Sequence, residues 1–166
     1  MFFDFKLESR MTTFPVQGGC HCNAVRYTLL APALSVQHCH CSRCRKTSGQ
    51  LCKTGAVIRR ADLKIEPTGN LTSYYSSPSF RSQFCKTCGC YLFSYEESEP
   101  AIMYLFAATL DGGVHPGHPN DKESHVYVGS RAEWDRLGEG VARYETDSPD
   151  EIVTEIQRKG EAGSGE

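Results

Sequence analysis

Nine cysteines constrain this chain more than any other feature of its 166-residue sequence. They lie at positions 20, 22, 39, 41, 44, 52, 85, 88 and 90, and most are separated from a neighbouring cysteine by only one or two residues. An odd number of cysteines cannot pair completely into disulfides, and these short spacings are typical of metal ligands. The sequence therefore indicates metal coordination by thiolates.

The rest of the composition is that of an ordinary globular domain. The first ten residues contain Asp4, Lys6 and Glu8 without an apolar core segment, so we expect no secretory signal and a cytoplasmic location. Disulfides are rare in that compartment. The longest apolar stretch, 101–108, is too short to span a bilayer. The net charge of −2 and the lack of a long basic run argue against a nucleic-acid partner.

Short runs of alternating apolar and polar residues predict a mainly β fold with antiparallel strands. Such runs are bounded by Gly, Pro, Asn or Ser. They cover Val25 to Leu29, Leu71 to Ser76, Tyr91 to Tyr95, Ile102 to Leu110, and His125 to Gly129.

A helix is indicated only near the C-terminus, where Ser148 can cap it and Pro149 suits its first position. We therefore expect an N-terminal extension over 1–13, one zinc-binding domain over 14–145, and a C-terminal helix with a flexible tail over 146–166.

Two distant cysteine pairs predict one closed zinc site. Cys20 and Cys22 lie in an extended segment, where residues two apart project to the same face. Cys85 and Cys88 have the spacing of a zinc knuckle, and Gly89 can adopt the positive φ that aims backbone N–H groups at sulfur. Four thiolates complete a tetrahedral structural site, which here would join segments more than sixty residues apart.

The remaining close cluster, Cys39, Cys41 and Cys44, offers three thiols within six residues. Three protein ligands leave the fourth position of zinc to water or substrate, which is the arrangement of catalytic sites. Basic residues surround this cluster: Arg43, Arg45 and Lys46. Their charges can stabilise the thiolates or hold a carboxylate of the substrate.

A second structural zinc is the alternative for this cluster. The candidates for its fourth ligand are His38, His40, Cys52 and Cys90. Cys90 is the strongest of them because it follows Cys88 by two residues on the same face of a strand. Cys52 is expected to be a small core residue. His21 and His40 alternate with ligands and should point away from the metal.

For the other polar candidates, ordinary structural roles are expected. Packed or solvated positions are predicted for His115, His118 and His125. A solvated strand edge is predicted for Lys53, Arg59 and Arg60.

Five segments of the chain occur in the order found in one known family: GGCHCNAVRY, CHCSRCRKTSG, FCKTCGCYLF, TLD and HVYVGSRAEW, between about Val16 and Tyr144. The chain resembles the glutathione-dependent formaldehyde-activating enzymes, a family that also contains the centromere protein V domain. This resemblance implies a β-tent fold with two zinc ions. Carried over by position, it makes Cys20, Cys22, Cys85 and Cys88 structural ligands, and Cys39, Cys41 and Cys44 active-site ligands.

The resemblance implies a carbon-sulfur lyase that acts on a glutathione adduct, either of the S-(hydroxymethyl)glutathione type or a larger conjugate. Glutathione would be the co-substrate, and Arg43, Arg45 and Lys46 its candidate binding residues. This sequence has Cys90 where the family more often has Ser or Thr. The competing hypothesis is a non-catalytic module with two structural zincs that binds another protein.

Overall fold

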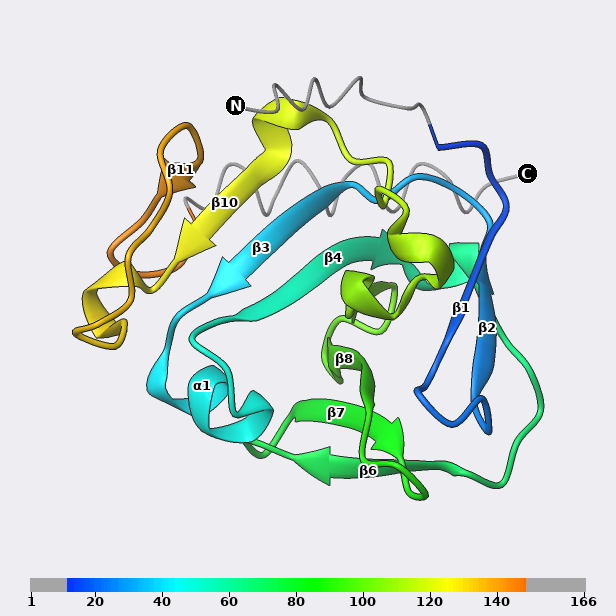
Figure 1. Ribbon diagram of the computed structural model, residues 1–166. Coiled ribbons are helices and arrows are strands. Elements are labelled where there is room, and N and C mark those ends of the chain that lie inside the picture. Colours follow the sequence, from blue (N-terminus) through cyan, green and yellow to red (C-terminus); the bar gives the residue numbers. More distant parts are fainter. Residues whose placement is uncertain (1–11, 149–166) are drawn as a thin grey trace, which may run out of the picture.

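A computed structural model describes residues 12–148, and strands dominate this part of the chain (Figure 1). The strands are β1 (Val16–Gly19), β2 (Arg26–Leu29), β3 (Ser35–Cys39), β4 (Lys53–Arg59), β5 (Leu63–Ile65), β6 (Leu71–Tyr75), β7 (Phe80–Cys85), β8 (Tyr91–Glu96), β9 (Ile102–Leu105), β10 (Glu123–Val126) and β11 (Ala142–Arg143). One α-helix, α1 (Ser42–Ser48), lies within the described residues. Short 3-10 turns cover Arg60–Asp62, Ala107–Thr109, Asp111–Gly113, Asn120–Lys122 and Val128–Ser130. The mainly β fold class is confirmed, and no described helix is long and apolar enough to cross a membrane.

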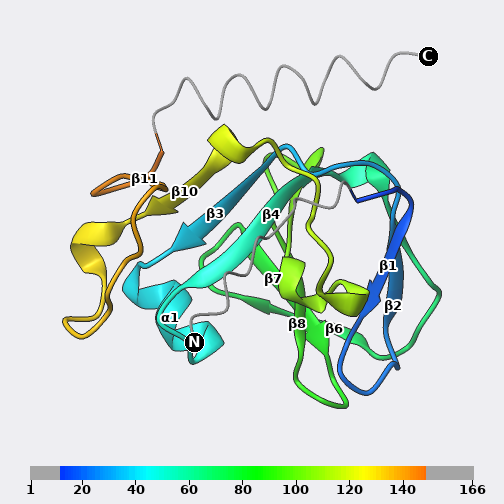
Figure 2. The same ribbon diagram turned by 45° about the horizontal axis from the view of Figure 1, so that its top comes forward.

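The strands form two sheets. The smaller has the order β1-β2-β5, and the larger has the order β11-β10-β3-β4-β9-β8-β7-β6. β1 and β2 lie at the opposite end of the molecule from β10 and β11 in both views (Figures 1 and 2). The sheets are not wholly antiparallel as expected, because β10 pairs in parallel with both β3 and β11. The connections permit this, since parallel pairing needs a crossover of about a dozen residues or more. Residues 127–141 join β10 to β11, and residues 40–122 separate β3 from β10.

One face of the larger sheet packs on the smaller sheet and forms the core. Tyr27 of β2 meets Phe93 of β8 edge to face, with ring centroids 5.3 Å apart. Gly18 of β1 lies against Tyr27 so closely that a Cβ atom there would be 2.3 Å from the Tyr27 ring. Other buried members of this core are Val25, Leu29, Val36, Ala56, Ile58, Leu92, Met103 and Leu105. This packing fixes the end of β1, from which the first cysteine pair follows.

The other face of the larger sheet carries polar side chains. Directly opposed residues of antiparallel strands share a face. Cys39 opposes Lys53, and Ser94 opposes both Ser82 and Tyr104. These residues therefore lie on one surface, away from the apolar core.

The predicted strands agree with β2, β6 and β8, and two others need correction. The run from Ile102 is a strand only to Leu105, because the chain turns into a 3-10 helix at Ala107. The last predicted strand begins earlier, at Glu123, and ends at Val126, because Tyr127 adopts a left-handed conformation with φ of 58°. Helix α1 was not predicted, and the C-terminal helix predicted from Pro149 lies outside the described residues.

Candidate metal centres and the cavity beside them

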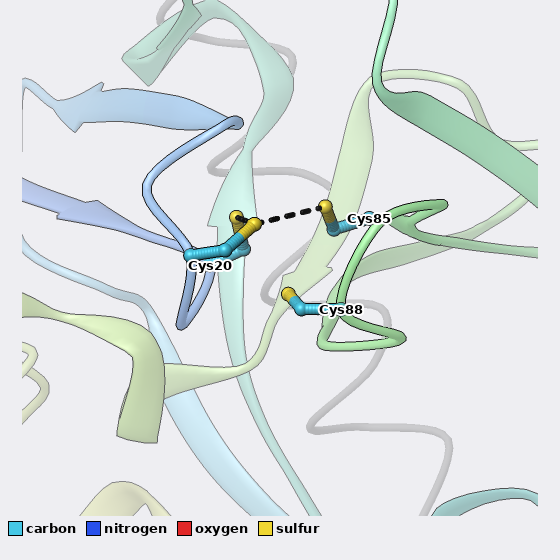
Figure 3. Close-up of side chains that lie close together, drawn as sticks. Cys20, Cys85 and Cys88 are labelled. Atoms are coloured by element: carbon cyan, nitrogen blue, oxygen red, sulfur yellow. Dashed lines mark hydrogen bonds between the residues drawn. The ribbon is translucent and has the colours of Figure 1, made fainter.

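The four-thiol site consists of Cys20, Cys22, Cys85 and Cys88, whose sulfur atoms all lie within 4.8 Å of one another (Figure 3). Cys22 Sγ lies 3.6 Å from Cys20 Sγ and 3.7 Å from Cys85 Sγ. These distances are far longer than a disulfide bond of about 2.05 Å. Two sulfurs bound at about 2.3 Å to a tetrahedral zinc are about 3.8 Å apart. The donor set and its spacing therefore fit zinc.

The four-thiol site joins the two sheets. Cys20 directly follows β1 of the smaller sheet, and Cys85 is the last residue of β7 in the larger sheet. Gly89 adopts the positive φ predicted for the knuckle, at 72°, and its N–H donates to Cys85 O at 2.8 Å. Burial opposes ionisation of Cys85, but the backbone N–H groups of Cys88 and Thr87 help to lower the pKa of this thiol to about 6. The turn thus favours the thiolate that a metal requires.

The three-thiol site consists of Cys39, Cys41 and Cys44, whose sulfurs also lie within 4.8 Å of one another. Cys39 ends β3, and Cys41 caps α1 by accepting a hydrogen bond from Cys44 N at 3.3 Å. Hydrogen bonding from Cys39 is the main reason why the pKa of Cys44 falls to about 6, while the pKa of Cys39 is raised. All three residues are partly exposed.

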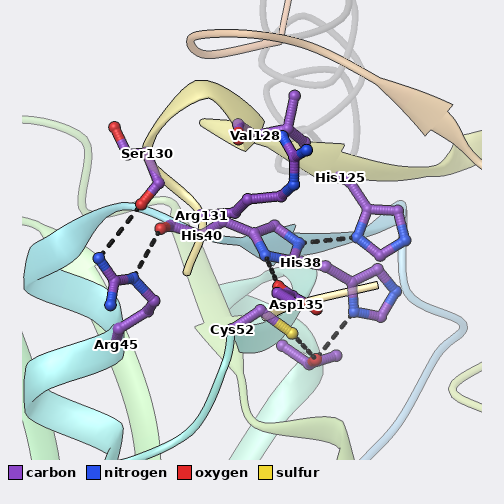
Figure 4. A network of polar contacts seen from close by, with 10 residues as sticks. His38, His40, Arg45, Cys52, His125, Val128, Ser130, Arg131 and Asp135 are labelled. Atoms are coloured by element: carbon purple, nitrogen blue, oxygen red, sulfur yellow. Dashed lines mark hydrogen bonds and ion pairs between the residues drawn. The ribbon is translucent and has the colours of Figure 1, made fainter. Parts of the chain in front are cut away.

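A buried polar network holds the loop between Cys39 and Cys41 (Figure 4). His40 is 1% exposed, and its Nδ1 lies 2.8 Å from Asp135 Oδ2. Its Nε2 lies 2.8 Å from His125 Nδ1. His40 therefore points away from the thiols, as predicted, and fixes the backbone that carries them.

Arg45 supports the same loop. Its Nε donates to His40 O at 3.3 Å, and its terminal nitrogen donates to Ser130 O at 3.2 Å (Figure 4). Arg43 lines the cavity described next, whereas Arg45 and Lys46 do not. Neighbours two apart on a helix face different directions, which separates Arg43 from Arg45. Arg45 and Lys46 thus lie outside this cavity, and the binding of glutathione by the three basic residues stays a prediction.

A cavity of about 580 Å³ opens beside the three-thiol site. Its wall combines Cys39, Cys41 and Cys44 with residues from β4, β8 and β9. No residue of the four-thiol site lines this cavity. The four-thiol site thus lies outside the cavity, whereas the three-thiol site faces a space large enough for a small-molecule ligand.

Lys53 lines the cavity. The prediction that it lies on a solvated strand edge is therefore wrong. Its Nζ lies 3.0 Å from Ser94 Oγ and 4.6 Å from the centre of the Phe106 ring. Burial lowers the pKa of Lys53, while the nearby thiols act in the opposite direction. Lys53 starts a strand and lies opposite Cys39, which would have indicated its place beside the thiols. This strand pairing is a property of the fold and cannot be recognised from the local sequence.

Within residues 12–148, neither thiol site includes any of the four candidates for a further ligand. These candidates are His38, His40, Cys52 and Cys90. His38 lies 2.8 Å from both Thr54 Oγ1 and Glu123 Oε1. Cys52 Sγ lies 3.9 Å from Thr54 Oγ1, and Cys90 Sγ donates to Tyr91 O. The remaining histidines are packed or at the surface as expected: His118 is buried near Glu123, and the exposed His115 stacks on His118.

Known proteins similar to this chain identify its family. A curated relative from Halomonas elongata, named "Putative glutathione-dependent formaldehyde-activating enzyme", is 28% identical over 127 residues, which cover 72% of this chain and 78% of that protein. A crystal structure of a Rhodobacter sphaeroides protein is 33% identical and has a TM-score of 0.49, covering 60% of this chain and 91% of that chain. The family model GFA, described as glutathione-dependent formaldehyde-activating enzyme, matches residues 15–130. The chain therefore belongs to the family of glutathione-dependent formaldehyde-activating enzymes.

Proposed function

We propose that this protein is a zinc-dependent carbon-sulfur lyase acting on glutathione adducts of the S-(hydroxymethyl)glutathione type. The observation that supports this most is the opening of the three-thiol site into a cavity. The family and the name of the Halomonas relative support glutathione and formaldehyde as the reactants. A cytoplasmic location is part of the same proposal, since free glutathione and reduced thiols occur there.

The two sites have different roles in this proposal. Cys20, Cys22, Cys85 and Cys88 hold a structural zinc, while Cys39, Cys41 and Cys44 hold a second zinc with one position open to substrate. Bound zinc supplies a Lewis acid that stabilises a substrate thiolate at neutral pH.

The reaction balances without a further reactant. In the cleavage direction the carbon-sulfur bond breaks, and its electron pair stays on the glutathione sulfur. The hydroxyl group of the adduct loses its proton to water as the carbon-oxygen double bond of formaldehyde forms. The glutathione sulfur takes up one proton from water on release, so the products are glutathione and formaldehyde. The chain contributes a cavity that holds the peptide, and the His40–Asp135 contact keeps the thiol loop in place.

A purely structural second site has less support. It needs a fourth ligand for Cys39, Cys41 and Cys44, yet His38 and His40 make hydrogen bonds elsewhere. In the described part of the chain, the three-thiol site also does not include Cys52 or Cys90.

Exchange spectroscopy tests the proposal, because formaldehyde and glutathione combine spontaneously and a simple product assay has a high background. At equilibrium, magnetisation transfer between glutathione and its hydroxymethyl adduct reports the interconversion rate. We expect the zinc-loaded protein to raise this rate and the Cys44→Ser variant to leave it at the spontaneous value. A fully zinc-loaded wild-type protein that does not raise the rate would contradict the proposed reaction.

A further inference from the structure

The cavity contains a half-buried ammonium group, that of Lys53, without a carboxylate partner. Lys53 Nζ contacts the hydroxyl groups of Ser94, at 3.0 Å, and Ser82, at 3.4 Å. Both serines are almost fully buried. Within residues 12–148, no carboxylate forms an ion pair with Lys53. Its charge is therefore balanced only by dipoles, aromatic rings and the thiols nearby.

Glu96, which lines the same cavity, has a carboxylate oxygen that lacks a hydrogen-bond donor. Glu96 ends β8 and lines the cavity, and its Oε1 is buried without a hydrogen-bond partner. A buried polar atom without a partner destabilises the fold, and more so when its group is charged. Glu96 is thus suited to accept hydrogen bonds from a cationic ligand.

Lys53 and Glu96 carry opposite charges and line the same cavity. Ser94, which contacts Lys53, and Glu96 are two residues apart on β8 and line the same cavity. Two strand residues span about 7 Å, and within the described residues Lys53 and Glu96 form no ion pair. A ligand with an ammonium and a carboxylate on one carbon can place its carboxylate at Lys53 and its ammonium at Glu96.

We propose that Lys53 and Glu96 together bind the α-amino acid head of the γ-glutamyl residue of glutathione. This inference rests on the proposed function, since it assumes a glutathione-derived substrate. Lys53 opposes Cys39 across the strand pair, so the bound head lies near the three-thiol site. The cysteine of glutathione, attached to this head through the γ-carboxyl group, can then direct its sulfur toward the thiols.

Three ligands measure the two contacts separately by calorimetry on the zinc-loaded protein. They are glutathione, its N-acetyl derivative, and a derivative with the γ-glutamyl α-carboxylate converted to a carboxamide. Each contact is a charge-assisted hydrogen bond, so we expect glutathione to bind at least about tenfold more tightly than either derivative.

Charge-removing variants then assign each preference. Glu96→Gln should lose the preference over the N-acetyl derivative and keep that over the carboxamide, and Lys53→Gln should do the reverse. Glu97→Gln and the exposed Lys64→Gln are the matched controls, because neither residue lines the cavity. Both controls should keep both preferences. Zinc content, measured for every variant, should stay constant.

Two results would overturn the inference: equal wild-type affinities for the three ligands, or a Lys53→Gln variant that loses zinc but keeps its preference over the carboxamide. The second result would mean that Lys53 only balances the thiolate charge. Failure of the proposed function looks different. A protein that shows both preferences but does not accelerate adduct exchange retains the binding site without the lyase activity.

Discussion

The two thiol sites use the same ligand atoms in different structural settings. The four-thiol site links β1 of one sheet to β7 of the other, and its residues Cys22 and Cys85 are 63 positions apart in the sequence. The three-thiol site lies within one short loop and the first turn of α1, and it faces a cavity. Distance along the chain and access to a cavity, rather than ligand type, thus separate a site suited to stabilising the fold from one suited to chemistry.

The largest expected effect is loss of folding when the four-thiol site is broken. Structural zinc contributes about 10–16 kcal/mol in peptide systems, which equals or exceeds a domain stability of about 5–15 kcal/mol. We expect Cys20→Ser and Cys88→Ser to abolish the cooperative thermal transition seen by circular dichroism. Cys90→Ser is the matched control and should melt nearly as the wild type does. A normal melt for Cys88→Ser would refute the structural role.

Breaking the three-thiol site should remove activity and leave the fold intact. We expect Cys39→Ser, Cys41→Ser and Cys44→Ser each to retain one zinc per chain and to reduce adduct exchange to the spontaneous rate. The reason is that these ligands lie in one local segment and tie no distant strands together. Metal analysis and thermal melts of the same samples check this. Destabilisation equal to that of Cys20→Ser would instead indicate two structural sites.

A smaller effect is expected from the network behind the three-thiol site. Asp135→Ala removes the partner of the buried His40 Nδ1 atom, which should lower the free energy of unfolding by about 1–3 kcal/mol. Urea denaturation measures this difference. Glu133→Ala, an exposed change in the same loop, should have little effect. If both variants lose the same stability, His40 does not depend on Asp135.

The sequence predicted the thiol sites well because each depends on local spacing. The four-thiol and three-thiol sites contain the cysteines that were predicted for them, and Gly89 has the expected positive φ. The division of the chain into an extension, a domain and a C-terminal tail stays a prediction. The roles of the two groups are proposals that the experiments above address.

The features that the sequence did not predict depend on contacts between distant segments. His40 and Asp135 are 95 residues apart, so only the folded chain shows that they meet. The parallel position of β10 likewise brings His125 beside His38. Lys53 looked like a surface residue because its neighbours in sequence give no sign of the cavity that Ser94 and Phe106 complete.

The central claim is that the three-thiol site is open to a substrate thiol whereas the four-thiol site is closed. Cobalt in place of zinc reports this directly, since its visible spectrum depends on the ligands bound to it. We predict that glutathione changes the spectrum of the wild-type protein loaded with two cobalt ions, and does not change that of Cys44→Ser, which keeps only the four-thiol cobalt. An unchanged wild-type spectrum at saturating glutathione would contradict the claim.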